Sequence, residues 1–390
     1  MMERCIVKGS ELQYLNHPWV YKGNIIDSKA EKGACVEVYS RKGSFLGSAI
    51  YNPDSSIVLR FYSRQKEELD YFAIKERLIR ADEKRKKYFR LPYYRLAYSE
   101  SDHLPGLVVD RYGDGVVFQI NSFGMDKRRE EIIKAIYDAF SPKFIIEKSS
   151  GFARKQENLP EREEVILNEN NVNLSRIMVE EGGFKFYVDL ISGQKTGYFY
   201  DQRRNRELLR SLSGKGIVLD AFSYVGTFAI MLAEKADKVY AVDISEESLE
   251  LLRENVKLNN LPEKKFVIEV KDAFDFLKEL ADLRIKFDII ILDPPSMVRR
   301  ARDIESAMKA YIELLADSIN ILNKSGLIAL FSCSNHIKWN HMFEIVAKGT
   351  CLKSRSFRIL EYLHQDFRDH VVPSGFLEAE YLRGFVIKEE

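Results

Sequence analysis

One cysteine stands between two serines in the segment FSCSNHI, residues 331–337, directly after the apolar run LIALF. Free cysteine is among the most buried residue types, so Cys333 could simply end a strand as a small packed side chain. A thiolate is also a strong nucleophile, and the same residue could attack an electrophilic carbon. The surrounding sequence must decide between a packing role and a catalytic one.

A second chemically distinctive segment is LDPPSM, residues 292–297, in which Asp293 precedes two prolines. Proline fixes φ and lacks an N–H donor, so the paired prolines form a rigid turn. Such a turn can present the Asp293 carboxylate and a backbone carbonyl to the edge of a nucleobase. We therefore expect substrate contacts from this turn and from the strand end beside Cys333, at Pro294, Pro295 and Ser332.

Acidic residues recur at the ends of successive apolar segments. Asp220 ends the run IVLD, Asp243 ends VYAVD, and Asp272 precedes Ala273 in VKDAF. The turn after Asp220 has one glycine, Gly226, and lacks the G-x-G-x-x-G that lets a backbone approach a pyrophosphate, which disfavours a dinucleotide. S-adenosylmethionine has no phosphates, and its positive charge suits an acidic strand end.

These acids predict an S-adenosylmethionine site. Asp220 would face the positive charge of the cofactor, and Asp243 would accept hydrogen bonds from both ribose hydroxyls. Asp272 and Ala273 would lie beside the adenine. No metal site is expected, because the cysteines at positions 5, 35, 333 and 351 form no C-x-x-C pair.

With this cofactor, Cys333 acquires a specific chemistry. Carbon 5 of a pyrimidine is a poor nucleophile until a thiolate adds at carbon 6, after which carbon 5 can attack the methyl group. Asp293 would support the charge or proton that develops at N3, and a base would remove the carbon-5 proton. His336 is a candidate base, although a structural or solvent-facing histidine is the commoner reading. Exocyclic N-methylation is disfavoured, because Ser296 stands where such enzymes place an aromatic residue to stack the base.

The elements that must position these residues are strands ending at a common edge. From about residue 214, apolar strand-sized segments alternate with helical ones. This alternation predicts a parallel sheet covered by helices on both faces, a doubly wound α/β domain. Ligands of such sheets bind at the carboxyl ends of the strands, where Asp220, Asp243, Asp293 and Cys333 would meet.

The first half of the chain follows other patterns. Residues 1 to about 66 contain short alternating segments broken by glycine, which predicts a small β-barrel or sandwich. Residues 67–90 take a helical period and end in the basic, aromatic run KRKKYFR, which is either a solvated face or an RNA-facing patch. Residues 91–176 predict a small α+β domain, in which the hydrophilic stretch 153–164 is expected to be an exposed loop.

Length and composition limit the number of domains and the classes of function that the chain can have. A chain of 390 residues is too long for one domain and predicts two or three. Sixty Lys+Arg against fifty-nine Asp+Glu give a net charge of +1, so a nucleic-acid role would have to come from local patches. The N-terminus has no apolar signal region and the aliphatic runs are strand-sized, which predicts a soluble, cytoplasmic protein with no membrane partner.

Several longer motifs point to one family. They are HPWVYKGNI (17–25), SESDHLPGLVVDRYGD (99–114), GQKTGYFYDQRRNR (193–206), LDPPSM, FSCSNH and DHVVPSGFLEAEYLRGF (369–385). Over nearly its whole length the chain resembles the 23S rRNA 5-methylcytosine methyltransferase family typified by the large-subunit methyltransferase I. The resemblance implies a PUA-like RNA-binding barrel at 1–66, a central α+β domain at 67–176 and a Rossmann-like S-adenosylmethionine-dependent methyltransferase domain at 177–390.

The resemblance also implies roles for single residues. Cys333 would be the nucleophile, next to Asp293, whose catalytic role is expected from the chemistry given above. The cofactor site would be lined by Tyr198, Tyr200, Gln202, Asp220, Phe222, Gly226, Asp243 and Ile244. Many related RNA enzymes carry a second cysteine directly after the paired prolines; this chain has Ser296 there, which excludes a mechanism with two cysteines.

The partner implied by the resemblance is 23S rRNA, naked or in a ribosomal particle. The barrel and central domain would bind its backbone and shape, and the target cytosine would have to leave its stack. Lys8, Lys22 and the basic run 84–90 are candidate phosphate contacts. The family also suggests a homodimer, which no motif in the chain demands.

Two other functions remain open at this point. The first is a guanine or adenine N-methyltransferase of rRNA, which would use the DPP turn without a covalent step and would tolerate replacement of Cys333. The second is a catalytically vestigial RNA-binding or ribosome-assembly factor. The intact acids at positions 220, 243, 272 and 293 argue against the second.

Overall fold

A computed structural model describes residues 2–8, 14, 16–298 and 301–390. It divides into two units. The first unit comprises Met1–Ile177, Asp189–Tyr200 and Phe367–Ala379. The second comprises Met178–Val188, Asp201–Asp366 and Glu380–Glu390. Neither unit is one continuous stretch of sequence, and the predicted division into three domains stays a prediction.

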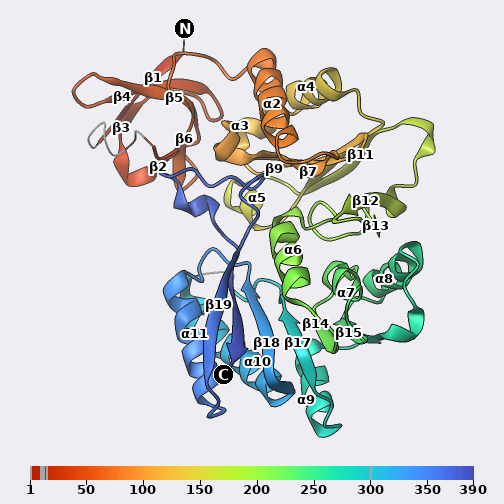
Figure 1. The fold of residues 1–390 in the computed structure, drawn as a ribbon. Helices are drawn as coiled ribbons and strands as arrows, with labels where there is room; N and C mark the ends of the chain where they lie inside the picture. Colours follow the sequence, from red (N-terminus) through yellow and green to blue (C-terminus); the bar gives the residue numbers. More distant parts are fainter. Residues whose placement is uncertain (1, 9–13, 15, 299–300) are drawn as a thin grey trace. The chain divides into compact units, whose positions relative to one another are not determined.

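The first unit begins with a curved six-stranded sheet (Figure 1). Its strand order is β2-β6-β5-β4-β1-β3, and only β1 and β4 run parallel. The elements are β1 (Glu3–Val7), β2 (Trp19–Tyr21), η1 (Lys22–Asn24), β3 (Ile25–Ser28), β4 (Cys35–Ser40), β5 (Phe45–Tyr51) and β6 (Ile57–Ser63). Alternate residues such as Val36 and Val38 fill its core, as the period of two requires.

A five-stranded sheet of order β11-β10-β9-β8-β7 forms the rest of this unit, with α2 and α4 packed together against it. Its strands are β7 (Tyr93–Tyr98), β8 (Leu107–Tyr112), β9 (Gly115–Ile120), β10 (Phe144–Ser149) and β11 (Arg162–Asn168). Its helices are α2 (Tyr71–Lys86), η2 (Ser99–Asp102), α3 (Phe123–Asp126), α4 (Arg129–Phe140), α5 (Phe152–Gln156), η3 (Glu169–Asn171) and η4 (Leu174–Arg176). Asp70 begins α2 by accepting a hydrogen bond from the Ala73 N–H.

Most residues of the stretch 153–164 are exposed, as expected, but the stretch is not a loop throughout. Helix α5 and the start of β11 occupy part of this stretch. Arg154 is fully buried, and its guanidinium donates to the Ile120 and Pro160 carbonyls and to Asp126. The hydrophilic composition of this stretch does not indicate the burial of Arg154, because the charge of Arg154 is satisfied inside the fold.

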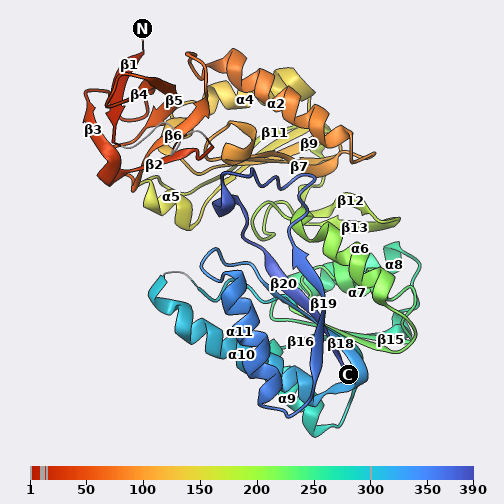
Figure 2. The same cartoon turned by 60° about the vertical axis from the view of Figure 1, so that its left-hand side comes forward.

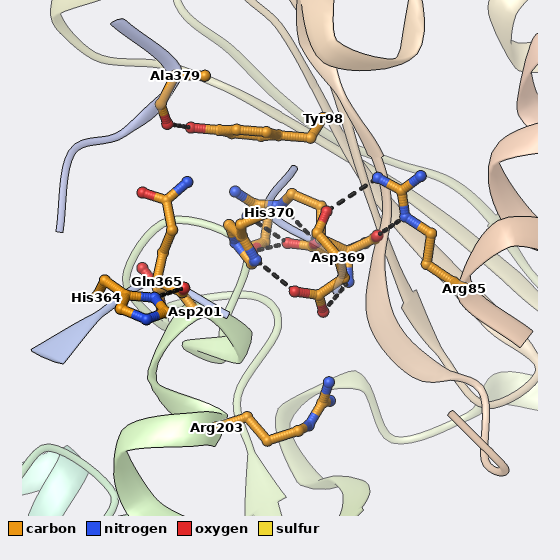
Figure 3. A network of polar contacts seen from close by, with 12 residues as sticks. Arg85, Tyr98, Asp201, Arg203, His364, Gln365, Asp369, His370 and Ala379 are labelled. Atoms are coloured by element: carbon orange, nitrogen blue, oxygen red, sulfur yellow. Dashed lines mark hydrogen bonds and ion pairs between the residues drawn. The ribbon is translucent and has the colours of Figure 1, made fainter. Parts of the chain in front are cut away.

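The basic run at the end of α2 is not uniformly a surface. Arg85 is 0% exposed and donates to both carboxylate oxygens of Asp102, at 2.7 and 2.5 Å. Its Nη2 also donates to the Asp369 carbonyl at 2.9 Å (Figure 3). The other basic residues of the run are exposed: Lys84, Lys86, Lys87 and Arg90. Arg85 is thus a structural residue rather than a phosphate contact.

Residues 367–379, which we call the C-terminal strap, are part of the first unit although they lie near the end of the chain. Tyr98 donates from its hydroxyl to the Ala379 carbonyl at 2.7 Å, and the Arg95 N–H donates to the Asp369 carboxylate at 3.1 Å (Figure 3). The other carboxylate oxygen of Asp369 lies 2.6 Å from Nδ1 of His370. Buried polar contacts therefore fix the strap along β7.

The second unit is built on a seven-stranded sheet of order β16-β15-β14-β17-β18-β20-β19. The first five strands in that order are parallel and β20 is antiparallel to both neighbours. The strands are β14 (Ile217–Ala221), β15 (Lys238–Asp243), β16 (Phe266–Val270), β17 (Phe287–Leu292), β18 (Leu322–Ser332), β19 (Phe357–His364) and β20 (Arg383–Glu389). From β14 the chain adds β15 and β16 on one side and then β17 and β18 on the other side, so the strand order reverses at β14. The expected ligand crevice therefore lies at the carboxyl end of β14.

Helices cover both faces of this sheet, as predicted. Figure 2 shows α9, α10 and α11 on one face and α6, α7 and α8 on the other. The helices are η5 (Tyr200–Gln202), α6 (Arg203–Leu212), α7 (Thr227–Leu232), α8 (Glu246–Leu258), η6 (Glu263–Lys265), α9 (Ala273–Asp282), η7 (Ala301–Asp303), α10 (Ile304–Asn320) and α11 (Trp339–Cys351), with η8 (Leu377–Ala379) in the strap. A two-stranded hairpin, β12 (Ile177–Glu181) and β13 (Phe184–Val188), precedes them. Among the described residues, no helix is long and apolar enough to cross a membrane.

Candidate active site

The turn between β14 and α7 has an unusual backbone. Phe222 and Tyr224 have φ values of 65° and 50°, and Gly226 has 79°. Left-handed conformations at residues other than glycine each cost about 1–3 kcal/mol and concentrate at ligand sites. A Cβ at Gly226 would lie 2.4 Å from Cγ of Leu252, so the glycine lets the turn pack directly on α8. The sequence thus builds a tight, strained turn at the expected ligand edge.

Asp220 lies beneath this turn with only 1% of its surface exposed. Its Oδ2 accepts a hydrogen bond from the Ala229 N–H at 2.9 Å. Burial, together with the nearby charges of Asp293 and Asp243, raises the pKa of Asp220 to about 8. A cation bound beside Asp220 would favour the ionised carboxylate. The sulfonium or the ammonium of S-adenosylmethionine supplies such a charge.

Asp243 at the end of β15 is held by two backbone donors. Its Oδ2 accepts from the Tyr224 N–H and its Oδ1 from the Ser245 N–H, each at 2.9 Å. These bonds fix the carboxylate plane next to the first turn, where it could accept from ribose hydroxyls. Ile244 follows with 76% of its surface exposed, an apolar side chain open at the strand end. That exposure is compatible with the predicted cofactor contact.

The predicted adenine residues have local roles as well. Asp272 caps α9, since its Oδ1 accepts from the Phe274 and Asp275 N–H groups at 2.9 and 3.3 Å. Ala273 is buried in the core. The ring of Phe222 lies 6.0 Å from that of Phe274, edge to face. Contact of Asp272 and Ala273 with adenine stays a prediction.

The DPP turn and the cysteine lie together at the rim of the sheet. Strands β17 and β18 are parallel neighbours, and Asp293 and Cys333 directly follow them. Sγ of Cys333 lies 3.8 Å from the Pro294 carbonyl oxygen. Pro294 is buried, while Pro295 is exposed at the surface of the turn. The thiol and the paired prolines are therefore adjacent, as the sequence suggested.

Beneath the rim, Ser332 is fully buried, and the Tyr311 hydroxyl donates to its Oγ at 3.1 Å. Burial raises the pKa of Tyr311, and the charges of Cys333 and Asp293 act in the same direction. The tyrosine therefore keeps its proton close to both catalytic candidates. A substrate contact for Ser332 stays a prediction, and its observed partner is Tyr311.

Gln202, predicted as a cofactor contact, donates from Nε2 to Oδ2 of Asp293 at 2.8 Å. Asn205 in turn donates from Nδ2 to Oε1 of Gln202 at 2.6 Å. Tyr198 and Tyr200 belong to the first unit and are buried, and the Tyr200 hydroxyl donates to the Arg111 carbonyl at 2.9 Å. Their predicted place in the cofactor site is still a prediction.

Sequence reasoning missed three residues around the acids. Arg206 is buried and donates to both carboxylate oxygens of Glu181, at 2.6 and 2.8 Å. Its charge lowers the pKa of Asp220, against the larger effect of burial. Glu181 is the second of these residues, and Asn205 is the third. Its spacing of three from Gln202, the N-cap residue of α6, was the available signal, because residues at this spacing lie on one side of a helix.

Other predicted contacts lie at the surface of the first unit. Lys8 and Lys22 are exposed, and Nζ of Lys8 donates to the Gly23 carbonyl at 3.1 Å. In the second unit, His336 is half-buried, and its backbone N–H donates to Oγ of Ser334. Within the described ranges, no group of three or more His, Cys, Asp or Glu side chains is placed to hold a metal ion.

Comparison with known proteins identifies the same parts. The sequence model of the PUA-like domain matches residues 14–64, and that of the TRM5/TYW2 methyltransferase domain matches residues 177–336. A solved structure from Streptococcus mutans, a candidate SAM-dependent methyltransferase, is 25% identical, with both chains fully covered and a TM-score of 0.84. A second candidate methyltransferase, solved with S-adenosylhomocysteine, has the same fold with a TM-score of 0.86 at 24% identity, again with full coverage of both chains. These findings confirm the predicted PUA-like and Rossmann-like methyltransferase folds.

Curated relatives match over almost the full chain. The ribosomal RNA large subunit methyltransferase I of Tolumonas auensis is 34% identical over 380 residues, 95% of each chain. The protein of the same name from Aeromonas salmonicida is 34% identical over 393 residues, 98% of each chain. With this similarity, the chain belongs to the ribosomal RNA large subunit methyltransferase I family, whose cofactor is S-adenosylmethionine.

Proposed function

We propose that this protein methylates carbon 5 of a cytosine in 23S rRNA, with Cys333 as the covalent nucleophile. As a member of its family the protein is an S-adenosylmethionine-dependent methyltransferase that acts on ribosomal RNA. The choice of base, of carbon atom and of nucleophile is the proposed part. The observation that carries it is the approach of Cys333 Sγ to 3.8 Å from the Pro294 carbonyl, beside Asp293, at the ligand edge of the sheet.

The chemistry follows from these positions. When bound, S-adenosylmethionine supplies an electrophilic methyl group. The Cys333 thiolate forms a bond to carbon 6 of the base, and the displaced π electrons make carbon 5 nucleophilic. Asp293 stabilises the charge or proton at N3. After methyl transfer, a base removes the carbon-5 proton, the double bond forms again and the thiolate leaves.

The remaining parts fit an RNA substrate. The chain carries a PUA-like domain in addition to its methyltransferase domain. Exposed cations at Lys8, Lys22, Lys84 and Lys87 could contact phosphates, whereas the exposed Lys86 is paired with Asp82 at 2.6 Å. The target cytosine would be flipped out of its stack to reach the rim. Such an enzyme would work in the cytoplasm on naked rRNA or a ribosomal particle.

One rival function has specific support. The matching domain model is named for the TRM5 and TYW2 methyltransferases rather than for a cytosine-5 enzyme. The rival reading is N-methylation of a purine without a covalent step. Ser296, which is exposed after the prolines, argues against it because no aromatic ring stands there to stack the base. A vestigial enzyme is disfavoured by the ordered carboxylates at Asp220, Asp243 and Asp293.

The decisive variant is Cys333→Ala. We expect methyl transfer to fall by at least about 10³-fold, since removal of a covalent nucleophile abolishes the step it begins. Labelled S-adenosylmethionine is incubated with unmodified 23S rRNA and, in parallel, with unmodified large-subunit particles. The RNA is then digested and the labelled nucleoside identified. Label in 5-methylcytosine that disappears in the variant supports the proposal.

Cys351→Ala is the matched control, because this cysteine is exposed at the end of α11 and lies outside the site. It should keep full activity, and both variants should bind S-adenosylmethionine normally. Label in a purine, together with an active Cys333→Ala enzyme, would establish the rival function and make the cysteine a packing residue.

A further inference from the structure

We propose that Asn205 is a positioning residue for the reaction: it selects the orientation of the Gln202 amide and thereby fixes the Asp293 carboxylate. This inference rests on the proposed function for the role of Asp293. Its geometric part stands independently, since all three side chains belong to the second unit and two measured hydrogen bonds connect them.

The orientation of the Gln202 amide follows from donor and acceptor chemistry. An ionised Asp293 can only accept hydrogen bonds, so the amide nitrogen of Gln202 must face it. The observed bond, from Nε2 to Oδ2 of Asp293, has a length of 2.8 Å. The carbonyl oxygen of the amide then faces the other way and requires a donor.

Asn205 provides that donor. Its Nδ2 lies 2.6 Å from Oε1 of Gln202. Both side chains are buried, with 2% and 3% of their surfaces exposed, so water is not available to replace the bond between them. Buried polar groups left without partners are costly. The NH2 group of Asn205 therefore makes one of the two amide orientations of Gln202 strongly preferred.

The backbone around Gln202 is fixed as well. The Asp201 carbonyl accepts from the Asp366 N–H at 2.9 Å, and the Asp201 carboxylate accepts from the Tyr381 hydroxyl. Helix α6 begins immediately after Gln202 and carries Asn205 in its first turn. Main chain and side chain are thus both held before a substrate arrives, which is the arrangement that orients a catalytic group.

The consequence concerns the plane of the Asp293 carboxylate. With Oδ2 fixed by Gln202, the carboxylate has a defined orientation at the rim, next to the turn whose Pro294 carbonyl lies against Cys333. A displacement of about 1 Å in a positioned group can lower turnover by about 10²-fold. Asn205 contributes to catalysis through this orientation without touching the substrate.

The test is Asn205→Asp, an isosteric change that removes the donor. The new carboxylate attracts the NH2 group of Gln202, so the amide turns and presents its oxygen to Asp293. We expect kcat to fall by about 10–10²-fold, while KM for rRNA, Kd for S-adenosylmethionine and the stoichiometry of cofactor binding stay unchanged. Normal stoichiometry separates this result from partial unfolding.

A double-mutant cycle shows whether Asn205 acts through Gln202. Gln202→Leu should lower kcat to a similar degree, and Asn205→Asp should add no further loss in that background, because no amide remains to be turned. Additive losses would overturn the proposal. A raised Kd for S-adenosylmethionine in both variants would also overturn it, since Gln202 would then be a cofactor contact.

Asn323→Asp is the matched control. Asn323 is at the start of β18, remote from the ligand edge, and its Nδ2 donates to Oδ1 of Asp288 at 2.8 Å. The same isosteric change there should leave kcat unchanged. If Asn205→Asp and Asn323→Asp affect kcat equally, Asn205 is a packing residue. The nucleoside made by the unmodified enzyme tests the proposed function separately, because the cycle measures turnover on whichever base is methylated.

Discussion

At the scale of single residues, the buried Asp220 lowers the stability of the folded protein and favours the binding of a cationic ligand. Its carboxyl is buried, and its pKa of about 8 lies well above the ordinary value of 3.8. Between these values the folded protein binds more protons than the unfolded chain does. The contribution of Asp220 to the free energy of unfolding therefore decreases as pH rises from about 4 to about 8. A bound cation would reverse this penalty.

The prediction from Asp220 concerns pH and the cofactor. Because the positive charge of S-adenosylmethionine favours the ionised carboxylate, its affinity should increase as pH rises through about 8. Asp220→Asn should abolish that dependence and weaken cofactor binding. It should also raise Tm at pH 8, by about 2–4 °C for each kcal/mol of relieved penalty. Calorimetric titration and thermal melts between pH 6 and pH 9 measure both effects.

The sign of the Tm change in Asp220→Asn shows whether the Asp220 carboxyl is protonated or ionised before the cofactor binds. The amide oxygen introduced by Asp220→Asn can still accept from the Ala229 N–H, so the local hydrogen bond survives the substitution. A lower Tm in Asp220→Asn, with pH-independent cofactor binding in the unmodified protein, would mean that Asp220 is ionised and structurally paired before the cofactor arrives.

At the scale of elements, the turn from β14 to α7 is the part most dependent on one residue type. Gly226 has a positive φ, and a Cβ would meet Leu252 at 2.4 Å. Gly226→Ala should destabilise the second unit by at least about 2 kcal/mol, from strain and overpacking together. It should also weaken cofactor binding, because the turn would have to move away from α8.

Gly214→Ala is the control for Gly226→Ala. Gly214 precedes β14 and has no atom within 4 Å of an added Cβ, so its replacement should change stability by less than about 0.5 kcal/mol. Denaturant titration of both variants with and without S-adenosylmethionine measures the difference. Equal stability of the two variants would show that the turn tolerates a side chain.

How far the sequence predicts these elements depends on whether the relevant pattern is local. Alternation of strands and helices predicted the parallel sheet, and strand-end acids predicted which residues would reach its edge. The burial of Arg154 and Arg85 was not predictable, because their partners lie far away in sequence. The bond from Gln202 to Asp293 spans 91 residues. No spacing rule predicts such a pair, and the cofactor contact predicted for Gln202 stays a prediction.

At the scale of the whole molecule, each unit is assembled from separate stretches of chain. The first unit includes the C-terminal strap, whose Asp369 carbonyl accepts from the buried Arg85. The second unit includes Met178–Val188, whose Glu181 pairs with the buried Arg206. If the chain were divided at Asp201, the first fragment would therefore lose the strap that accepts from Arg85. The second fragment would lose Glu181, the partner of Arg206.

This arrangement predicts where the second unit can be separated. A fragment of residues 201–390 lacks the β12–β13 hairpin, and with it the carboxylate of Glu181 that pairs with Arg206 at 2.6 Å. Loss of one partner of a buried ion pair costs about 3–5 kcal/mol. We expect a fragment of residues 178–390 to melt cooperatively and bind S-adenosylmethionine, and the shorter fragment to do neither.

Full-length Glu181→Gln should show part of the same loss of stability, since it leaves Arg206 with a weaker acceptor. If both fragments bind the cofactor equally well, the hairpin is dispensable, and the methyltransferase fold begins at Asp201 rather than near residue 177.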